Sequence, residues 1–108
     1  MRADMLNKIN ILKPVYERNE YGEPETTWLS VFTNVYASKE PLLGNEFFKA
    51  AATQSKAEVK YRTYYFSGVE TDMRIYDEDG MHEILSVINV KSLNRELLIY
   101  CKKVTDDG

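Results

Sequence analysis

The sequence predicts a mainly β protein: a small antiparallel β-barrel or sandwich of about six strands, with one short helix or loop inserted between the second and third strands. Three observations lead to this prediction. Apolar and polar residues alternate with a period of two over much of the chain, as they do in half-buried strands. An Asp-Gly pair at residues 79–80 separates two such stretches. Residues 40–55, EPLLGNEFFKAAATQS, break the pattern with a segment suited to a helix.

Size and composition are those of an ordinary globular domain. With 108 residues, the chain predicts a single domain spanning residues 1–108. It carries 14 basic and 17 acidic residues, and this net charge of −3 gives no electrostatic attraction to nucleic acid or to an anionic membrane. No apolar run reaches the length of a signal peptide or a membrane span, so we expect a chain that is made in the cytoplasm.

Two strands are expected in the first part of the chain. Residues 7–15 alternate, with Ile9 and Ile11 on one side, and Pro14 is expected to end this strand because proline cannot donate to a ladder. Residues 16–25 are rich in charge and read as an exposed loop. Residues 26–39 predict a long strand that is covered on both sides, by a second sheet or a neighbouring subunit. Its two expected faces are Leu29, Val31, Val35 and Ala37, and Trp28, Phe32 and Tyr36.

Four further strands are expected after residue 56. Residues 57–66 alternate, and residues 73–89 predict two strands joined around Asp79-Gly80, the pair preferred where both turn residues have a positive φ. Residues 95–104 predict the last strand. The expected inward residues of the third and last strands are Ala57, Val59, Tyr61 and Thr63, and Leu97, Ile99 and Cys101.

The insertion, at about residues 40–56, has two interpretations. Leu43 and Phe47 fall on one face of a short helix that Asn45 could cap. A helix of this length is marginal in water, so it must dock on something. It either packs across one open end of the monomer, which composition alone favours, or finds its partners in other chains.

No pattern of residues indicates an enzyme, a cofactor or a metal. His82, the only histidine, is expected to face solvent from a strand, and the lone Cys101 is expected to be a small buried hydrophobe. The acidic run at residues 77–80 is expected to be a solvated hairpin tip, since Ile88 stands where a calcium-binding loop needs its glutamate.

One alternative class is a small β-barrel that binds nucleic acid. Its bases would stack on Tyr61, Tyr64 and Tyr65, with Lys60 and Arg62 contacting phosphates. Aromatic residues are equally common in strand cores and at protein–protein contacts, which we regard as the stronger interpretation.

Five segments taken in order resemble the head–tail joining proteins of long-tailed phages, also called head-closure or head–tail adaptor proteins. They are LNKINILKP, YGEPETTW, NVYASKEPLLGNEFFKA, MRIYDEDGMHEILSVIN and RELLIYC, and together they cover about residues 5–103. Each segment is weak evidence alone, whereas their order and spacing are specific.

This resemblance implies a structural protein of a phage or prophage. It implies a homo-oligomeric ring of this protein at the head–tail connector of the virion, assembled in the host cytoplasm, with portal, adaptor and tail proteins as its partners. The ring would encircle DNA without reading its sequence, close the exit channel and dock the tail, with no role for a membrane. The expected channel segment is Glu40, Pro41, Leu42, Leu43, Gly44, Asn45, Glu46, Phe47, Phe48 and Lys49. The expected subunit interface is Trp28, Phe32 and Tyr36.

Overall fold

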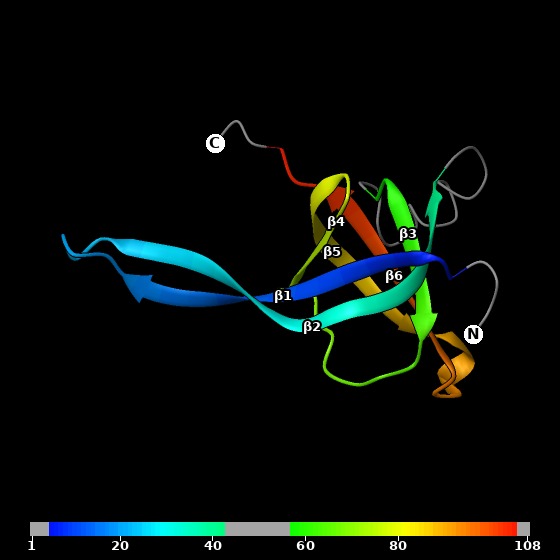
Figure 1. The fold of residues 1–108 in the computed structure, drawn as a ribbon. Helices are drawn as coiled ribbons and strands as arrows, with labels where there is room; N and C mark the ends of the chain where they lie inside the picture. Colours follow the sequence, from blue (N-terminus) through cyan, green and yellow to red (C-terminus); the bar gives the residue numbers. More distant parts are fainter. Residues whose placement is uncertain (1–4, 43–56, 106–108) are drawn as a thin grey trace.

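The computed structural model describes residues 5–42 and 57–105. Its elements are β1 (Asn7–Arg18), β2 (Pro24–Pro41), β3 (Val59–Tyr64), β4 (Arg74–Asp77), β5 (Gly80–Asn89), the 3-10 turn η1 (Val90–Ser92) and β6 (Glu96–Lys103). The strands form one antiparallel sheet in the order β1-β2-β3-β6-β5-β4, and β4 pairs with β1 to close it (Figure 1). The prediction of a mainly β protein with six strands is therefore confirmed.

The helix or loop expected between the second and third strands falls on residues 43–56, outside the described residues. Among the described residues, none form a helix long and apolar enough to cross a membrane.

The core lies inside the closed sheet and receives side chains from all six strands. The alternation predicted for the third and last strands is confirmed, since Tyr61, Thr63, Ile99 and Cys101 are fully buried. The core cluster consists of Ile9, Ile11, Ala37, Val59, Tyr61, Ile75, Ile84, Leu97, Ile99 and Cys101. Closure leaves this part of the sheet without free edges, because each strand has two neighbours there.

The two predicted faces of the second strand are wrong, because β2 does not keep a period of two. Its register against β1 shifts twice, between Ile9 and Leu12, and each shift places an extra residue in β2. Asn34 lies at the first shift with φ 54°, and its N–H donates to the Asn10 side chain at 2.9 Å. As a result Phe32 and Val35 both pack on the core although they are three positions apart.

The predicted end of the first strand at Pro14 is also wrong. β1 continues to Arg18, and Pro14 pairs with Trp28 of β2. β1 pairs with β4 only at residues 10–12, so Pro14 lies where one side of the strand is unpaired. Proline is tolerated there because no neighbouring strand requires its missing N–H.

The predicted hairpin of β4 and β5 is present, with its turn one residue earlier than expected. Asp77 pairs with Gly80, so the two turn residues are Glu78 and Asp79. Gly80 has φ 115°, whereas neither turn residue has a positive φ. The glycine is needed just after the turn, where the chain re-enters the strand.

Candidate assembly interface

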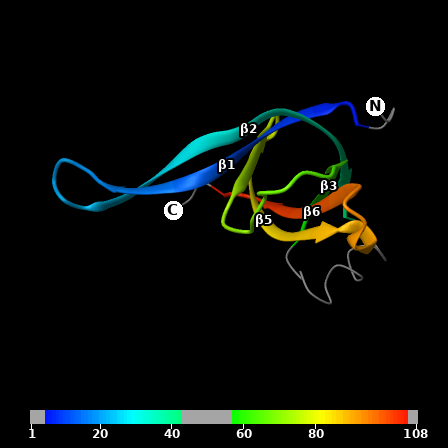
Figure 2. The same cartoon turned by 90° about the horizontal axis from the view of Figure 1, so that it is seen from below.

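A two-stranded arm projects from the closed sheet and dominates the outline of the molecule (Figures 1 and 2). We define the arm as residues 13–29, the outer halves of β1 and β2 with the turn between them. Its strands pair with each other from Lys13↔Leu29 to Arg18↔Pro24. The pairing of β2 with β3 covers only residues 38–41. Within the described part of the chain, both edges of the arm are therefore unpaired, and such edges are templates for contacts with other chains.

The turn of the arm is held by its own hydrogen bonds. The Asn19 side-chain oxygen accepts the backbone N–H groups of Tyr21 and Glu23 at 2.9 and 3.0 Å. The Arg18 guanidinium donates to the Gly22 carbonyl at 2.6 Å, and Gly22 has φ 78°, which favours glycine. A two-stranded hairpin is marginal in water, so these local bonds are needed to define the tip.

The base of the arm is anchored by an aromatic contact. The Arg74 guanidinium of β4 lies 4.2 Å from the centre of the Trp28 ring. A cation over a tryptophan face is a favourable contact, worth about 0.5–1 kcal/mol where it is exposed. Trp28 therefore ties the arm to the body of its own subunit.

The other two predicted interface residues lie in different surroundings. The Phe32 ring packs on Phe66 with their centroids 4.9 Å apart, which makes it partly a core residue. Tyr36 is 42% exposed, with the Lys8 ammonium 5.4 Å from its ring centre. Trp28, Phe32 and Tyr36 do not form the single face that was expected, because the register shifts in β2 separate them.

The predicted channel segment is described only at its start. Glu40 and Pro41 belong to β2 and pair with Lys60 and Val59 of β3, so the strand reaches further than the expected end at residue 39. Leu42 is buried and its N–H donates to the Glu58 carbonyl at 3.0 Å. The remaining residues of that prediction, Leu43, Gly44, Asn45, Glu46, Phe47, Phe48 and Lys49, lie outside the described residues.

The two flanks of residues 43–56 are fixed to the body at one place. Leu42 and Ala57 form a small apolar cluster with Leu85 and Tyr100. The Glu58 N–H donates to the Cys101 carbonyl at 2.8 Å, which attaches the second flank to β6. Leu42 and Ala57, the described residues on either side of this segment, therefore lie in one cluster on the sheet.

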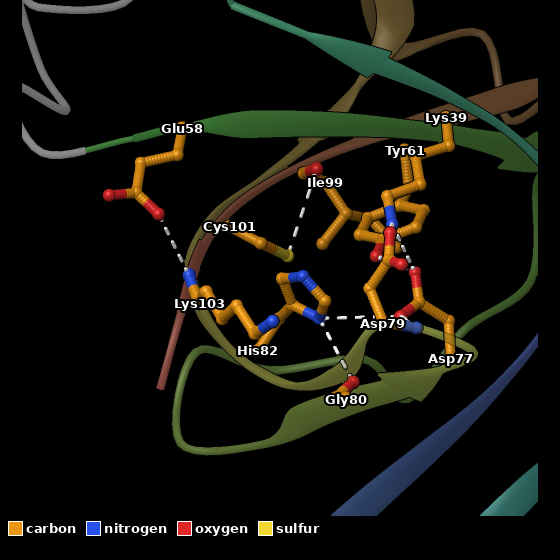
Figure 3. Close-up of polar contacts among 10 residues, drawn as sticks. All are labelled: Lys39, Glu58, Tyr61, Asp77, Asp79, Gly80, His82, Ile99, Cys101 and Lys103. Atoms are coloured by element: carbon orange, nitrogen blue, oxygen red, sulfur yellow. Dashed lines mark hydrogen bonds and ion pairs between the residues drawn. The ribbon is translucent and has the colours of Figure 1, made fainter. Parts of the chain in front are cut away.

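A buried polar cluster lies at the hairpin of β4 and β5, where a solvated tip was expected (Figure 3). Asp77 is buried, and it accepts hydrogen bonds from the Lys39 ammonium at 2.7 Å and from the Tyr61 hydroxyl at 2.5 Å. The Asp79 N–H adds a third bond at 2.9 Å, whereas the Asp79 side chain is 62% exposed. The expectation is therefore wrong for Asp77, which is held by residues from β2 and β3 that are distant in sequence.

The ionisation of this cluster follows from its hydrogen bonds. Burial alone would raise the pKa of Asp77, but the bonds from Lys39, Tyr61 and the Asp79 backbone outweigh it and lower that pKa. Burial also opposes the charge on Lys39, yet its contacts with Asp77 and Asp79 raise its pKa. Burial and the neighbouring Asp77 raise the pKa of the Tyr61 hydroxyl, which stays protonated. The cluster is thus a direct Lys39–Asp77 ion pair whose carboxylate also accepts a hydrogen bond from a neutral phenol.

His82 belongs to the same region, and the expectation that it faces solvent is wrong. Its side chain is buried against the Tyr61 ring, with the ring centres 5.9 Å apart. Nδ1 lies 3.2 Å from the Gly80 carbonyl and 3.8 Å from an Asp77 oxygen. The polar core that receives the His82 side chain could not be read from the sequence.

The chemistry available to this cluster is limited. Burial raises the pKa of the Cys101 thiol, so the thiolate that a nucleophile requires is disfavoured, in keeping with the predicted buried hydrophobe. In residues 5–42 and 57–105, His, Cys, Asp and Glu side chains form no group of three or more that could hold a metal ion. The polar groups hydrogen-bond one another and join β2, β3 and β4.

The proposed base-stacking surface is not assembled. Tyr61 is fully buried and hydrogen-bonded to Asp77, so no base can reach it. Arg62 donates to Glu96 at 2.9 Å, and only Tyr64 and Tyr65 keep substantial exposure. The observations therefore give no support to the nucleic-acid alternative.

The arm is the feature that the sequence reasoning missed. A run of charged residues with a glycine and a proline was read as a loop, although β-formers flank it on both sides. Val15 precedes it, Tyr16 begins it, and Thr26, Thr27 and Trp28 follow it, which is the signal that could have indicated two long paired strands.

Comparisons with known proteins agree with this description. The family model described as phage head completion protein matches residues 1–104. The solution structure of protein SF1141 from Shigella flexneri 2a covers 99% of this chain and all of its own, with a TM-score of 0.75 and 20% identity, and so shares the fold. None of the curated proteins compared with the chain matches it. The chain belongs to the phage head completion protein family, and its role is a structural one in the phage head.

Proposed function

We propose that this protein forms a ring at the head–tail interface of a phage particle, closes the DNA exit channel of the packaged head and offers the docking surface for the tail. The observation that carries this proposal is the match of the head completion family along residues 1–104, nearly the whole chain. A family of head structural proteins also favours a non-enzymatic role. The partners would be portal, adaptor and tail proteins.

The proposed channel element is the segment that begins at Glu40 and runs through Lys49. Its support is the anchoring of Leu42, within this segment, and of Ala57, which follows residues 43–56, in one apolar cluster on the sheet. A segment held at both ends by a rigid body is presented at the same place by every subunit of a ring. Several copies then meet at high local concentration, which favours contacts between them.

The charge of the chain suits a ring that surrounds DNA without holding it. Its net charge of −3 gives little attraction to the phosphate backbone, so packaged DNA could pass during ejection. Tyr36, exposed beside Lys8, is the predicted interface residue best placed for a neighbouring subunit. The contribution of Trp28 and Phe32 to such an interface remains a prediction.

Deletion of the gene from the phage or prophage that encodes it tests this function. We expect DNA-filled heads without tails, whose DNA becomes accessible to nuclease, and recovery of both defects when the protein is supplied. A variant in which aspartate replaces Phe47 and Phe48, supplied to the same deletion, should restore tail attachment less well than the wild-type protein. The DNA in these heads should stay accessible to nuclease. Normal yields of tailed, nuclease-resistant particles from the deletion would overturn the proposal.

A further inference from the structure

We infer that the tip of the arm is one half of a head-to-tail contact, and that it docks on the pocket beside η1 of a second copy of the chain. This inference rests on the proposed ring and adds the two surfaces that would build it. We call residues 16–25 the arm tip. The receiving pocket is lined by Tyr64, Val90, Lys91, Leu93, Arg95 and Glu96.

The two surfaces lie at opposite ends of the molecule. The arm tip and η1, coloured orange, are at opposite extremes in both views (Figures 1 and 2). The chain is elongated, with principal extents of 47 × 28 × 26 Å. Two different surfaces at opposite ends cannot meet within one subunit, but they can join one subunit to the next. Such a heterologous contact is the type that generates rings.

The charges of the two surfaces are complementary. The arm tip contains four glutamates and one arginine, a formal charge of −3. Residues 90–95 contain Lys91 and Arg95 and no acidic residue. Neither cation has an ion-pair partner among the described residues, and Glu96 at the rim of the pocket is paired with Arg62 at 2.9 Å. The acidic tip therefore fits the basic pocket of another copy better than it fits a second acidic tip.

One pair in the arm is unfavourable in the isolated chain. Glu17 and Glu25 stand directly opposite each other on its two strands. Like charges in this position destabilise a hairpin. A cationic surface placed against both side chains would offset this repulsion by attracting each carboxylate, so the pair is more favourable in contact than in the free subunit.

The pocket is a hollow of about 570 Å³ with a largely apolar lining, held by an unusual backbone. Lys91, Ser92 and Asn94 have φ of 53°, 55° and 55°, a region that residues other than glycine seldom adopt. The Asn89 side chain fixes this loop by donating to the Asn94 side chain at 2.7 Å and accepting its N–H at 3.0 Å. Such conformations concentrate at functional sites.

The tip supplies a side chain that suits the hollow. Tyr21 is 80% exposed at the end of the arm, and Leu93 at the pocket is 53% exposed. Burying a tyrosine against an aliphatic lining is a common anchor of protein interfaces. The arm tip is shorter than the roughly 20–30 residues that each side contributes to a standard interface. A single contact should therefore be weak and become stable only when a ring closes.

Thiol cross-linking of the full chain tests the contact. Cys101 is fully buried, so the maleimide should react with the introduced cysteine and not with Cys101. We expect a bifunctional maleimide to join E20C to K91C in a mixture of the two variants, well above either variant alone. The matched control pairs E20C with E70C, since Glu70 is exposed and lies on another loop. Self-linking of E20C at the same yield, or no E20C–K91C product in the concentrated protein and in phage particles, would overturn the inference.

Charge variants separate a contact from a structural role. E17K/E25K in the E20C copy should lower the yield with K91C about tenfold, since exposed charge pairs become repulsive. Adding R95E to the K91C copy should recover part of that yield. E17Q/E25Q should weaken cross-linking without destabilising the free chain, because it removes the repulsive pair. Unchanged yields would refute the contact.

The readouts keep this inference distinct from the proposed function. One outcome is that heads assembled with the E17K/E25K variant retain their DNA and attach tails although cross-linking fails. In that case the proposed ring is kept, and its subunits contact one another through other surfaces. If the deletion has no effect on heads, the proposed function itself fails.

Discussion

Replacing Asp77 with asparagine should destabilise the fold far more than the same change at Asp79. Both carboxylates contact the Lys39 ammonium, at 2.7 and 2.5 Å, but the Asp77 side chain is 4% exposed and the Asp79 side chain 62%. The D77N change leaves the Tyr61 hydroxyl with a neutral partner in a buried site, and Lys39 keeps only the exposed Asp79 as its charged partner. Breaking a buried charged interaction costs about 3 kcal/mol, whereas an exposed pair is worth about 0–1 kcal/mol.

Urea denaturation at pH 7 measures both costs against the wild type. The pH dependence gives an independent check. Because the folded-state pKa of Asp77 is lowered, its contribution is complete above the unfolded-state value of about 3.9 and is lost as the pH falls through the folded-state pKa. The difference between wild type and D77N should therefore shrink as the pH falls below about 4. Equal costs for D77N and D79N, or a difference that persists in acid, would refute the reasoning.

Three further outcomes are expected. G68A should cost about 2–3 kcal/mol in thermal unfolding, since Gly68 has φ 106° and a Cβ there would lie 3.1 Å from the Phe32 ring. The control G22A, with φ 78° and nothing within 4 Å, should cost about 1 kcal/mol; equal losses would contradict this account. N19A should speed hydrogen exchange at the arm turn and leave the closed sheet protected, because it removes three side-chain hydrogen bonds. Burial raises the pKa of Cys101, so its alkylation at pH 8 should proceed only at the rate of unfolding; rapid labelling of the folded chain would be inconsistent with the buried thiol.

The regular strands could be predicted because their signal is local. In β3 and β6 the inward residues Tyr61, Ile99 and Cys101 fall on alternate positions, so a period of two identified both strands and their core-facing sides. The hairpin of β4 and β5 was predicted from Asp79-Gly80, although the turn is one residue earlier. The family resemblance added what alternation could not, the head–tail class of protein.

The misjudged features depend on pairing between distant segments. No residue near Asn34 in the sequence predicts that the Asn10 side chain accepts its N–H or that the pairing register of β2 shifts there. Likewise, His82 and Asp77 have the local sequence of an exposed hairpin. They are buried because Lys39 contacts Asp77 and Tyr61 contacts both residues. Propensity describes a residue and its neighbours along the chain, and a buried polar cluster is stabilised by partners that propensity does not include.

The sequence by itself determined that this chain forms a small β domain, because hydrophobic alternation and turn chemistry act over a few consecutive residues. The tertiary structure alone decided where the sheet closes and where β1 and β2 run on without a third strand. That boundary is set by the short overlaps of β1 with β4 and of β2 with β3. Strand pairing is a long-range interaction, so only the folded chain separates the closed body from the arm that extends beyond it.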